Sequence, residues 1–204
     1  MDMNDNELRD AQLTALQNQI TPHYIVNTLD AIRMKLILDG QSESAELLRC
    51  FQESLRTYAL RPDETVLLEE ELGFLEDYLK LQSFRLLGKL SWNFQTDPAA
   101  LRVPIPRFIL QPLVENAVRH GLDPAMDAPC ITVTAHIDAE RLFLSVSDNG
   151  RGISGTSGSG IGIQNVNQRL RLLYDENCSV ILQTVPSAGT CASVCLPIKG
   201  GEIL

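Results

Sequence analysis

The sequence predicts an α+β protein, in which an N-terminal helical hairpin precedes a two-layer α/β domain whose helices cover one face of a mixed sheet. Residues 25–39 and 45–59 carry apolar residues at heptad spacing, which indicates two amphipathic helices. From Leu90 onward, strand-like segments alternate with helical ones. An apolar fraction of 44% over 204 residues is ample for a packed core. We therefore expect two domains, at residues 1–88 and 89–204.

The first two helices are predicted to form a hairpin through a turn at Asp39-Gly40. Its apolar seams are formed by Ile25, Leu29, Ile32 and Leu36 in one helix and by Leu48, Phe51, Leu55 and Tyr58 in the other. Two helices are too thin to bury both faces, so we expect a homodimer that forms a four-helix bundle. Packing of the hairpin against the chain's own second domain is the alternative. A third helix, at about 68–87, is expected to join the two domains.

The second domain is predicted from alternating strands and helices. Strands are expected at 90–95, 131–138, 141–147, 179–185 and 190–197, and helices at about 107–121 and 161–175. Read as a helix, 107–121 gathers Asn116, Arg119 and His120 on one face, opposite its apolar residues. An Asn amide oxygen is a suitable ligand for Mg²⁺, and a neighbouring Arg and His could meet phosphate oxygens. A capped helix with a solvated polar face is the ordinary alternative.

A carboxylate is predicted to stand at a strand end. Asp148 ends the strand 142–147 and begins the turn Asp-Asn-Gly, where it could accept a hydrogen bond from an exocyclic amine such as that of adenine. Gly150 and Gly152 would allow close approach of the backbone to a base and ribose. The segment 154–162 is rich in Ser and Gly and leads into a helix whose first N–H groups would point at phosphates.

Two other glycine motifs are excluded. Gly150-Arg-Gly152-Ile-Ser-Gly155 matches the dinucleotide fingerprint, but its third glycine opens no helix and an aspartate precedes its first. The sequence has no Gly-Lys-Ser/Thr, so it lacks a Walker-type loop.

Taken together, these motifs resemble the ATPase domain of gyrase-type ATPases, histidine kinases and Hsp90-like chaperones, which is the GHKL or Bergerat type. The stretches 111–121, 148–152 and 160–170 look like the N-box and glycine boxes of LytS/YesM-type sensor histidine kinases. The resemblance extends to Gln17–Leu29, with its Thr-Pro-His23, and to Glu71–Arg85. It covers residues 13 to 198, and four motifs in the correct order are far more specific than any one of them.

The resemblance implies a role for each matching residue. His23 is expected to be the phosphoacceptor, with Asn27 one turn on as a helper, and Asn116 to be the Mg²⁺ ligand. Asp148 is expected to read adenine. The full set expected to bind ATP is Asn116, Arg119, His120, Asp148, Gly150, Gly152, Gly160, Ile161, Gly162 and Asn165. Gyrase-type ATPases carry a water-positioning glutamate four residues before the N-box Asn, a slot taken here by Pro112, which favours transfer of phosphate over its hydrolysis.

His23 also fits a nucleophile on physical grounds. An imidazole with a pKa near 6.5 is largely neutral at cellular pH, so a ring nitrogen can attack a γ-phosphorus without strong activation. The residues that follow it, Tyr24-Ile25-Val26, depart from the usual family pattern. His136 alternates with apolar residues as an outward strand residue and is assigned no function.

Composition narrows the partners and the compartment. A net charge of −9 argues against nucleic acid as a partner. Five cysteines without a Cys-x-x-Cys pair favour free thiols in a reducing cytosol. No stretch approaches the roughly 20 apolar residues of a membrane span, and the N-terminus does not resemble a signal peptide. We expect the cytoplasmic catalytic part of a longer, membrane-anchored receptor that phosphorylates a response-regulator receiver domain.

Two alternatives stay open at this point. A catalytically inactive scaffold would bind ATP without ever becoming labelled. A serine kinase of the anti-sigma type would share the ATP-binding fold but make acid-stable phosphate, and the hairpin with His23 argues against it.

Overall fold

The computed structural model describes residues 22–58, 65–122, 126–152, 161–174, 178–185 and 189–198. It divides into two compact units, Met1–Arg61 and Pro62–Leu204. Within the described ranges, no helix combines the length and the apolar character needed to cross a membrane.

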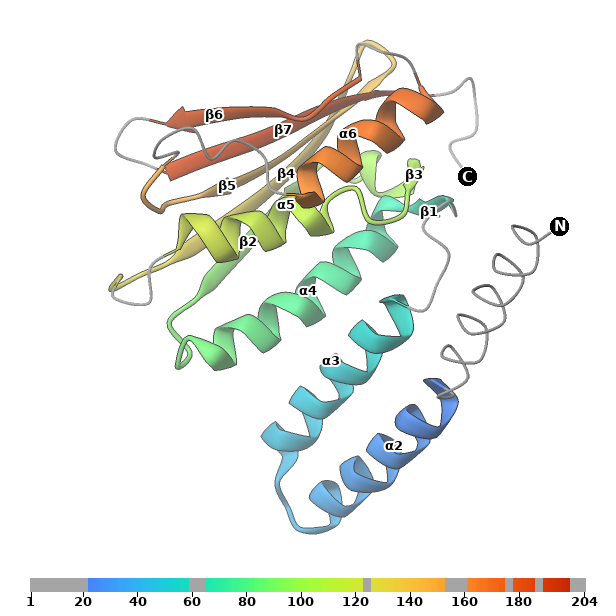
Figure 1. The fold of residues 1–204 in the computed structure, drawn as a ribbon, viewed down its shortest axis with the longest axis vertical. Helices are drawn as coiled ribbons and strands as arrows, with labels where there is room; N and C mark the ends of the chain where they lie inside the picture. The colour runs from blue at the N-terminus through green and yellow to red at the C-terminus, as the bar shows by residue number, and fades with distance from the viewer. Residues whose placement is uncertain are drawn as a thin grey trace, which may run out of the picture. The chain divides into compact units, whose positions relative to one another are not determined.

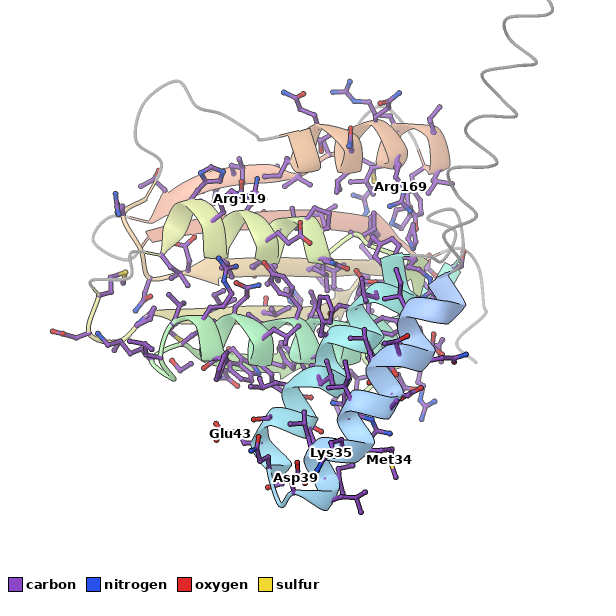
Figure 2. The ribbon with its side chains drawn as sticks, turned by 60° about the horizontal axis from the view of Figure 1, so that its bottom comes forward. Met34, Lys35, Asp39, Glu43, Arg119 and Arg169 are labelled. Atoms are coloured by element: carbon purple, nitrogen blue, oxygen red, sulfur yellow. The ribbon has the colours of Figure 1, made fainter. Side chains whose placement is uncertain are left out.

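The first unit contains the predicted hairpin, formed by α2 (Pro22–Leu38) and α3 (Ser42–Tyr58), which lie side by side (Figure 1). The turn closes at Gly40, whose φ of 73° lies in the left-handed region, while the Gln41 N–H donates to the Leu36 carbonyl at 2.9 Å. Such a left-handed residue after a helix favours glycine. Lys35 and Asp39 form an ion pair beside this turn (Figure 2). Between the helices, Gln52 Nε2 donates to Asp30 Oδ1 at 3.0 Å.

Only part of the two apolar seams of the hairpin is buried. Leu29, Leu36, Leu48 and Leu55 are partly buried. Ile25, Ile32 and Phe51 are 41%, 48% and 44% exposed. The hairpin therefore leaves part of its predicted seam open to solvent.

The second unit is a five-stranded sheet with helices on one face (Figure 1). The strand order is β2-β4-β5-β7-β6; β2 pairs with β4 in parallel, and the other pairs are antiparallel. The strands are β2 (Ser91–Thr96), β4 (Cys130–Asp138), β5 (Arg141–Asp148), β6 (Ile181–Val185) and β7 (Gly189–Pro197). This mixed sheet, in two layers with its helices, is the predicted fold class.

Three helices cover the sheet, namely α4 (Leu68–Arg85), α5 (Gln111–Asn116) and α6 (Ile161–Leu173), and a π-helical turn, η2 (Ala117–Gly121), continues α5. The sequence did not predict the small sheet formed by β1 (Thr65–Leu67) and β3 (Pro104–Pro106), nor the 3-10 turn η1 (Ala100–Arg102). One hydrophobic core lies between the helices and the sheet and includes Leu75, Leu113, Val133, Leu144 and Leu170.

The third predicted helix exists, but it belongs to the second unit. Leu68, Leu72, Leu75 and Leu79 of α4 are buried in the core of that unit. The compact units consequently divide between Arg61 and Pro62, before α4. The domain boundary after residue 88 stays a prediction. The apolar face of α4 decides this division, because it is continuous with the core beneath the sheet.

The predicted helix 107–121 is shorter than expected. Residues 107–110 form a turn in which Phe108 has a φ of 61°, and α5 begins only at Gln111. Pro112 explains the late start, because a proline fits the first turn of a helix but would break one that began several residues earlier. The final turn, Ala117–Gly121, is π-helical, a distortion that is often found at functional sites.

Candidate functional site

Alternation along β5 turns Asp148 toward the helices. Leu142, Leu144, Val146 and Asp148 are all buried on the same face of the sheet. Successive side chains of a strand point to opposite faces, so the aspartate continues the core-facing row at the end of the strand. It is 5% exposed. The carboxylate predicted at this strand end is thus an inward-facing group beneath the helical layer.

Backbone amides hold one oxygen of this carboxylate. The Gly150 N–H donates to Asp148 Oδ1 at 2.9 Å, and the Thr190 N–H donates to the same atom at 3.3 Å. Burial raises the pKa of Asp148 above its usual value, and the two amide hydrogen bonds oppose this rise. Among the described residues, both hydrogen bonds reach Oδ1, which leaves Oδ2 as the acceptor that a ligand would meet.

Three glycines form a cradle around Asp148. A Cβ added to Gly121 would stand 2.5 Å from Oδ1 and 2.6 Å from Oδ2. A Cβ on Gly189 would collide with the Asp148 backbone oxygen, and one on Gly150 with the Gly121 carbonyl. Gly189 also has a φ of 93°, which a larger residue would adopt only under strain. Any side chain at these positions would fill the space around the carboxylate.

The N-box face opens into a pocket of about 300 Å³. Asn116 is half-buried, while Arg119 and His120 are exposed at the end of the helix, where Figure 2 shows Arg119. Their apolar counterparts Leu113 and Val114 are buried, as the helical pattern predicted. The pocket is lined by Pro112, Glu115, Asn116, Arg119, His120, Gly162 and Ile163.

The pocket joins two motifs that are distant in the sequence. Gly162 lies at the start of α6, and a Cβ there would contact Pro112 Cβ at 3.4 Å. The N-box helix and the helix that follows the glycine-rich segment therefore meet. Gly121, the last residue of η2, connects the pocket to Asp148 through its contact with the carboxylate.

Among the described residues, the other predicted site residues do not line this pocket. Gly152 has a φ of 73° and approaches Thr184, while Asn165 is exposed on α6 and does not line the pocket. His23 and Asn27 lie one turn apart on α2, in the first unit; Asn27 is exposed. Gly160, the rest of 153–160, and the side chains of His23 and Ile161 fall outside the described part of the structure.

Sequence reasoning missed several residues of the site. Glu115 lines the pocket and accepts a hydrogen bond from Gln111 Nε2 at 2.9 Å, and its position beside Asn116 was the available signal. Gly121 lies within the predicted N-box, 111–121, but no role was predicted for it. Gly189 gave no local signal, because only the pairing of β5 with β7 brings it to Asp148.

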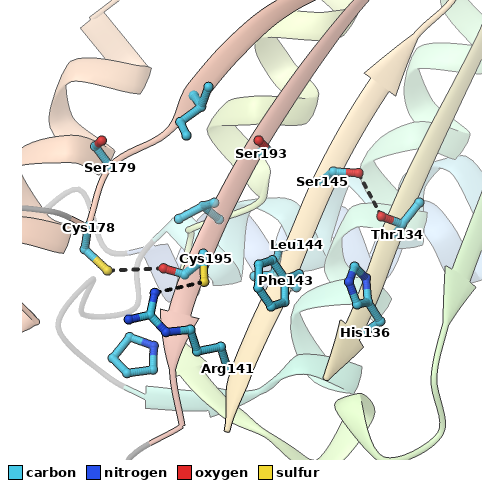
Figure 3. A pocket seen from close by; sticks show the side chains of 13 residues that line it. Thr134, His136, Arg141, Phe143, Leu144, Ser145, Cys178, Ser179, Ser193 and Cys195 are labelled. Carbon is cyan, nitrogen blue, oxygen red and sulfur yellow. Dashed lines mark hydrogen bonds between the residues drawn. The ribbon is translucent and has the colours of Figure 1, made fainter. Parts of the chain in front are cut away.

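A larger hollow, of about 390 Å³, lies on the opposite face of the sheet (Figure 3). His136 stacks on Phe143 there with ring centroids 5.1 Å apart, and the Thr134 and Ser145 hydroxyls are 2.7 Å apart. None of the predicted site residues lines it. The convergence of motifs, not the size of the hollow, therefore locates the candidate site.

A mixed sheet with helices on one face, an inward aspartate in a glycine cradle, and an N-box helix beside the pocket define the class of histidine kinase- and gyrase-like ATPases. The family model described as "Histidine kinase-, DNA gyrase B-, and HSP90-like ATPase" matches residues 103–200. A second model, "Histidine kinase", matches residues 11–90 and so includes both the hairpin and α4. Both parts of the chain thus match histidine kinase models, and within the histidine kinases the likeness is to the LytS/YesM type.

Curated relatives support this assignment. The chain is 28% identical to the sensor histidine kinase YesM of Bacillus subtilis (strain 168), over 94% of this chain and 34% of the relative. It is 30% identical to the sensor protein LytS of Staphylococcus haemolyticus, over 96% of this chain and 36% of the relative. The chain therefore spans about a third of the length of these relatives.

Solved structures show the same fold. The histidine kinase AdeS of Acinetobacter baumannii superposes with a TM-score of 0.54 at 17% identity, over 88% of this chain and 96% of that one. The catalytic domain of the histidine kinase ThkA gives a TM-score of 0.53 at 17% identity, over 66% of this chain and 95% of that domain. At this identity the likeness concerns the fold alone.

Proposed function

We propose that this chain is the catalytic portion of a two-component sensor histidine kinase, which uses Mg·ATP to phosphorylate His23 and then passes the phosphoryl group to an aspartate of a response-regulator receiver domain. The observation that carries the proposal is the convergence of Asn116, Arg119, His120 and Gly162 on one pocket, joined through Gly121 to the buried Asp148. An N-box helix and a glycine-box helix thereby lie near a carboxylate that can bind a nucleobase.

The Asp148 end of the site fits adenine. Because Oδ1 already accepts two backbone amides, the carboxylate is held in one orientation, and Oδ2 accepts the exocyclic amine of the base. A guanine carbonyl at the same place would be repelled. Gly150, Gly152 and Gly189 keep this region free of side chains, so a planar base and its ribose can approach the backbone.

The Asn116 end fits phosphates and Mg²⁺. Its amide oxygen supplies a hard ligand, and the pocket leaves room for the waters and phosphate oxygens that complete an octahedron. Bound Mg²⁺ neutralises the charge that develops on the transferred phosphoryl group. Arg119 and His120 hold phosphate oxygens from the end of the same helix. The start of α6, with Ile161, Gly162 and Asn165, directs its N–H groups to the phosphates, and Gly160, the residue before it in the sequence, completes the proposed set.

His23 is the phosphoacceptor in this proposal. A ring nitrogen attacks the γ-phosphorus, so that an N–P bond forms while the bond to the bridging oxygen of ADP breaks, and ADP leaves. Asn27 lies one turn further along α2 and helps to orient the phosphoryl group. Pro112 lines the pocket at the position where gyrase-type ATPases carry a water-positioning glutamate, which favours transfer to histidine over rapid hydrolysis.

The open seam of the hairpin supports a homodimer. Ile25 and Ile32 are one heptad apart on α2, and Phe51 belongs to the predicted seam of α3. All three are more than 40% exposed, so a second hairpin would bury them in a four-helix bundle. The net charge of −9 makes nucleic acid an unsuitable partner. We place the kinase on the cytoplasmic side of the membrane, as part of a longer anchored receptor, because its relatives are named as sensor proteins.

The proposal is tested by incubating the full chain with γ-labelled ATP and Mg²⁺ and treating the labelled protein with acid and with alkali. Label that survives alkali and is lost in acid is expected in the wild type and absent in His23→Ala. His136→Ala is the matched control, because it removes an exposed histidine of the outer sheet face and should leave labelling unchanged.

The other results point to the two alternatives. ATP binding without any label would indicate a catalytically inactive scaffold. Acid-stable label that persists in His23→Ala would indicate a serine kinase of the anti-sigma type. Label that is acid-labile but persists in His23→Ala would show that another residue accepts the phosphate.

A further inference from the structure

A carboxylate on α4 caps the beginning of the N-box helix. Glu71 is 1% exposed; its Oε2 accepts the Phe108 N–H at 3.0 Å, and its Oε1 accepts the Leu110 N–H at 3.2 Å. The Gln111 N–H, the first of α5, also donates to this side chain. The first N–H groups of a helix have no partner within it, so an acceptor from elsewhere satisfies them and favours the local dipole. Helix α5 therefore receives its cap from another helix.

The capped segment has an unusual backbone. Phe108 has a φ of 61°, in the left-handed region that non-glycine residues rarely occupy and only under strain. Its own N–H is one of the three amide groups that donate to Glu71. Arg107, which is buried, places its guanidinium 5.5 Å from the ring centroid of Phe74, one turn from Glu71 on α4. Helix α4 thus contacts the strained turn at two neighbouring positions.

Burial raises the pKa of Glu71, and the three amide hydrogen bonds together with the charge of Arg107 oppose this rise. A carboxyl group in this position is costly unless it is well hydrogen-bonded. Its two oxygens serve two amides of the same short turn, so the side chain specifies the position of that turn and does more than fill the core.

The same face of α4 continues to the pocket. Tyr78 stands two turns after Glu71, and its pKa is raised to about 12 by burial and then by the charge of Glu115, against lowering by Arg85 and Arg119. Glu115 and Arg119 both line the pocket. Helix α4 is itself fixed by Leu75 and Leu79, which are buried in the core. It therefore follows the N-box helix from its capped start to the pocket.

We propose that Glu71 is a positioning residue of the nucleotide site: by binding the amides of Phe108 and Leu110 it sets where α5 begins, and thereby where Asn116 stands. Asn116 lies five residues after Gln111, about 7.5 Å along the helix. A displacement at the capped start is therefore carried directly to the phosphate and metal end of the pocket. The Asp148 end is held by β5, β7 and their glycines, and does not depend on Glu71.

This inference rests on the proposed binding of Mg·ATP, and its test compares two ligands that use different ends of the site. In Glu71→Gln an N–H donor replaces one of the two acceptor oxygens. Affinity of the full chain for Mg·ATP, measured by calorimetry, should fall on the order of tenfold, the change expected for one lost hydrogen bond. Affinity for adenosine, which the Asp148 end reads, should change less than about twofold.

A second measurement, on the protein without nucleotide, accompanies the calorimetry. Hydrogen exchange of the Phe108 and Leu110 amides should accelerate in Glu71→Gln, while the amides of β4 and β5 keep their protection. Glu70→Gln is the matched control, because Glu70 is the neighbouring, exposed carboxylate of the same helix and should alter neither measurement. If Glu71→Gln does not fold, Glu71→Asp replaces it; this variant keeps the charge but is too short to reach both amides.

The outcomes are distinguishable. Equal losses for Mg·ATP and adenosine, or no loss for either in a folded variant, would overturn the positioning role. A wild-type chain that binds no Mg·ATP would instead overturn the proposed function itself.

Discussion

Replacing Asp148 with asparagine should separate stability from nucleotide binding, because the two depend on different oxygens. Oδ1 accepts the Gly150 and Thr190 amides, and an asparagine keeps that oxygen. Oδ2 becomes an amide nitrogen, which donates a hydrogen bond and cannot accept one from the amine of adenine. The side chains have nearly the same shape, so the glycine cradle around Gly121 is undisturbed.

The expected loss of affinity follows from the hydrogen bond that disappears. A hydrogen bond to a charged acceptor contributes about 1.5–3 kcal/mol, which corresponds to a rise in the Kd for ATP of about 10- to 150-fold. The fold should not weaken at neutral pH. Burial raises the folded-state pKa of Asp148, so its contribution to stability is present below its ordinary pKa and is lost as pH rises through the folded-state pKa. Asparagine does not ionise, so the Asp148→Asn chain does not lose this stability as the pH rises.

Calorimetric titration with ATP and thermal unfolding at several pH values would check both parts. Asp138→Asn provides the control, because it makes the same change of charge at an exposed residue next to the opposite end of β5. We expect weaker ATP binding and a flatter pH dependence of stability only in Asp148→Asn. Unchanged ATP affinity in a folded Asp148→Asn chain would refute the reasoning that this carboxylate meets the base.

Three further predictions concern other parts of the molecule. Gly121→Ala should lower ATP affinity at least tenfold in calorimetry, because its Cβ would displace the Asp148 carboxylate. Gly73→Ala, whose Cβ would meet nothing within 4 Å, should instead stabilise α4 by about 1 kcal/mol in thermal unfolding. Ile32→Glu should convert a dimer to monomers in sedimentation experiments, and Met34→Glu, equally exposed but off the heptad seam, should not; equal effects would contradict the bundle. Tyr78→Phe should reduce the loss of unfolding free energy between pH 10 and 12, measured by alkaline unfolding. The pKa of Tyr78 is raised to about 12 in the folded state, so the neutral phenol stabilises the fold below pH 10 and this contribution is lost as the pH rises toward 12.

Local patterns of the sequence account for much of the architecture. Heptad spacing predicted the hairpin, and alternation along 142–148 determined that Asp148 shares the face of Leu142, Leu144 and Val146. Helical spacing separated the buried Leu113 from the half-buried Asn116. These features depend only on the period of a helix or strand, and neighbouring residues are sufficient to reveal that period.

Tertiary structure decided what depends on partners far along the chain. Glu71 reaches Phe108 across 37 positions, and Thr190 reaches Asp148 across 42; neither contact leaves a periodic trace in the sequence. The same holds for α4, whose apolar stripe is equally compatible with the hairpin or the sheet until the core beneath the sheet accepts it. The sequence by itself predicted which residues carry the chemistry, and its local periods determined the faces that Asp148 and Asn116 occupy. Only the packing of distant segments decided how the carboxylate, the N-box helix and its cap are held, because those positions depend on contacts that no local pattern specifies.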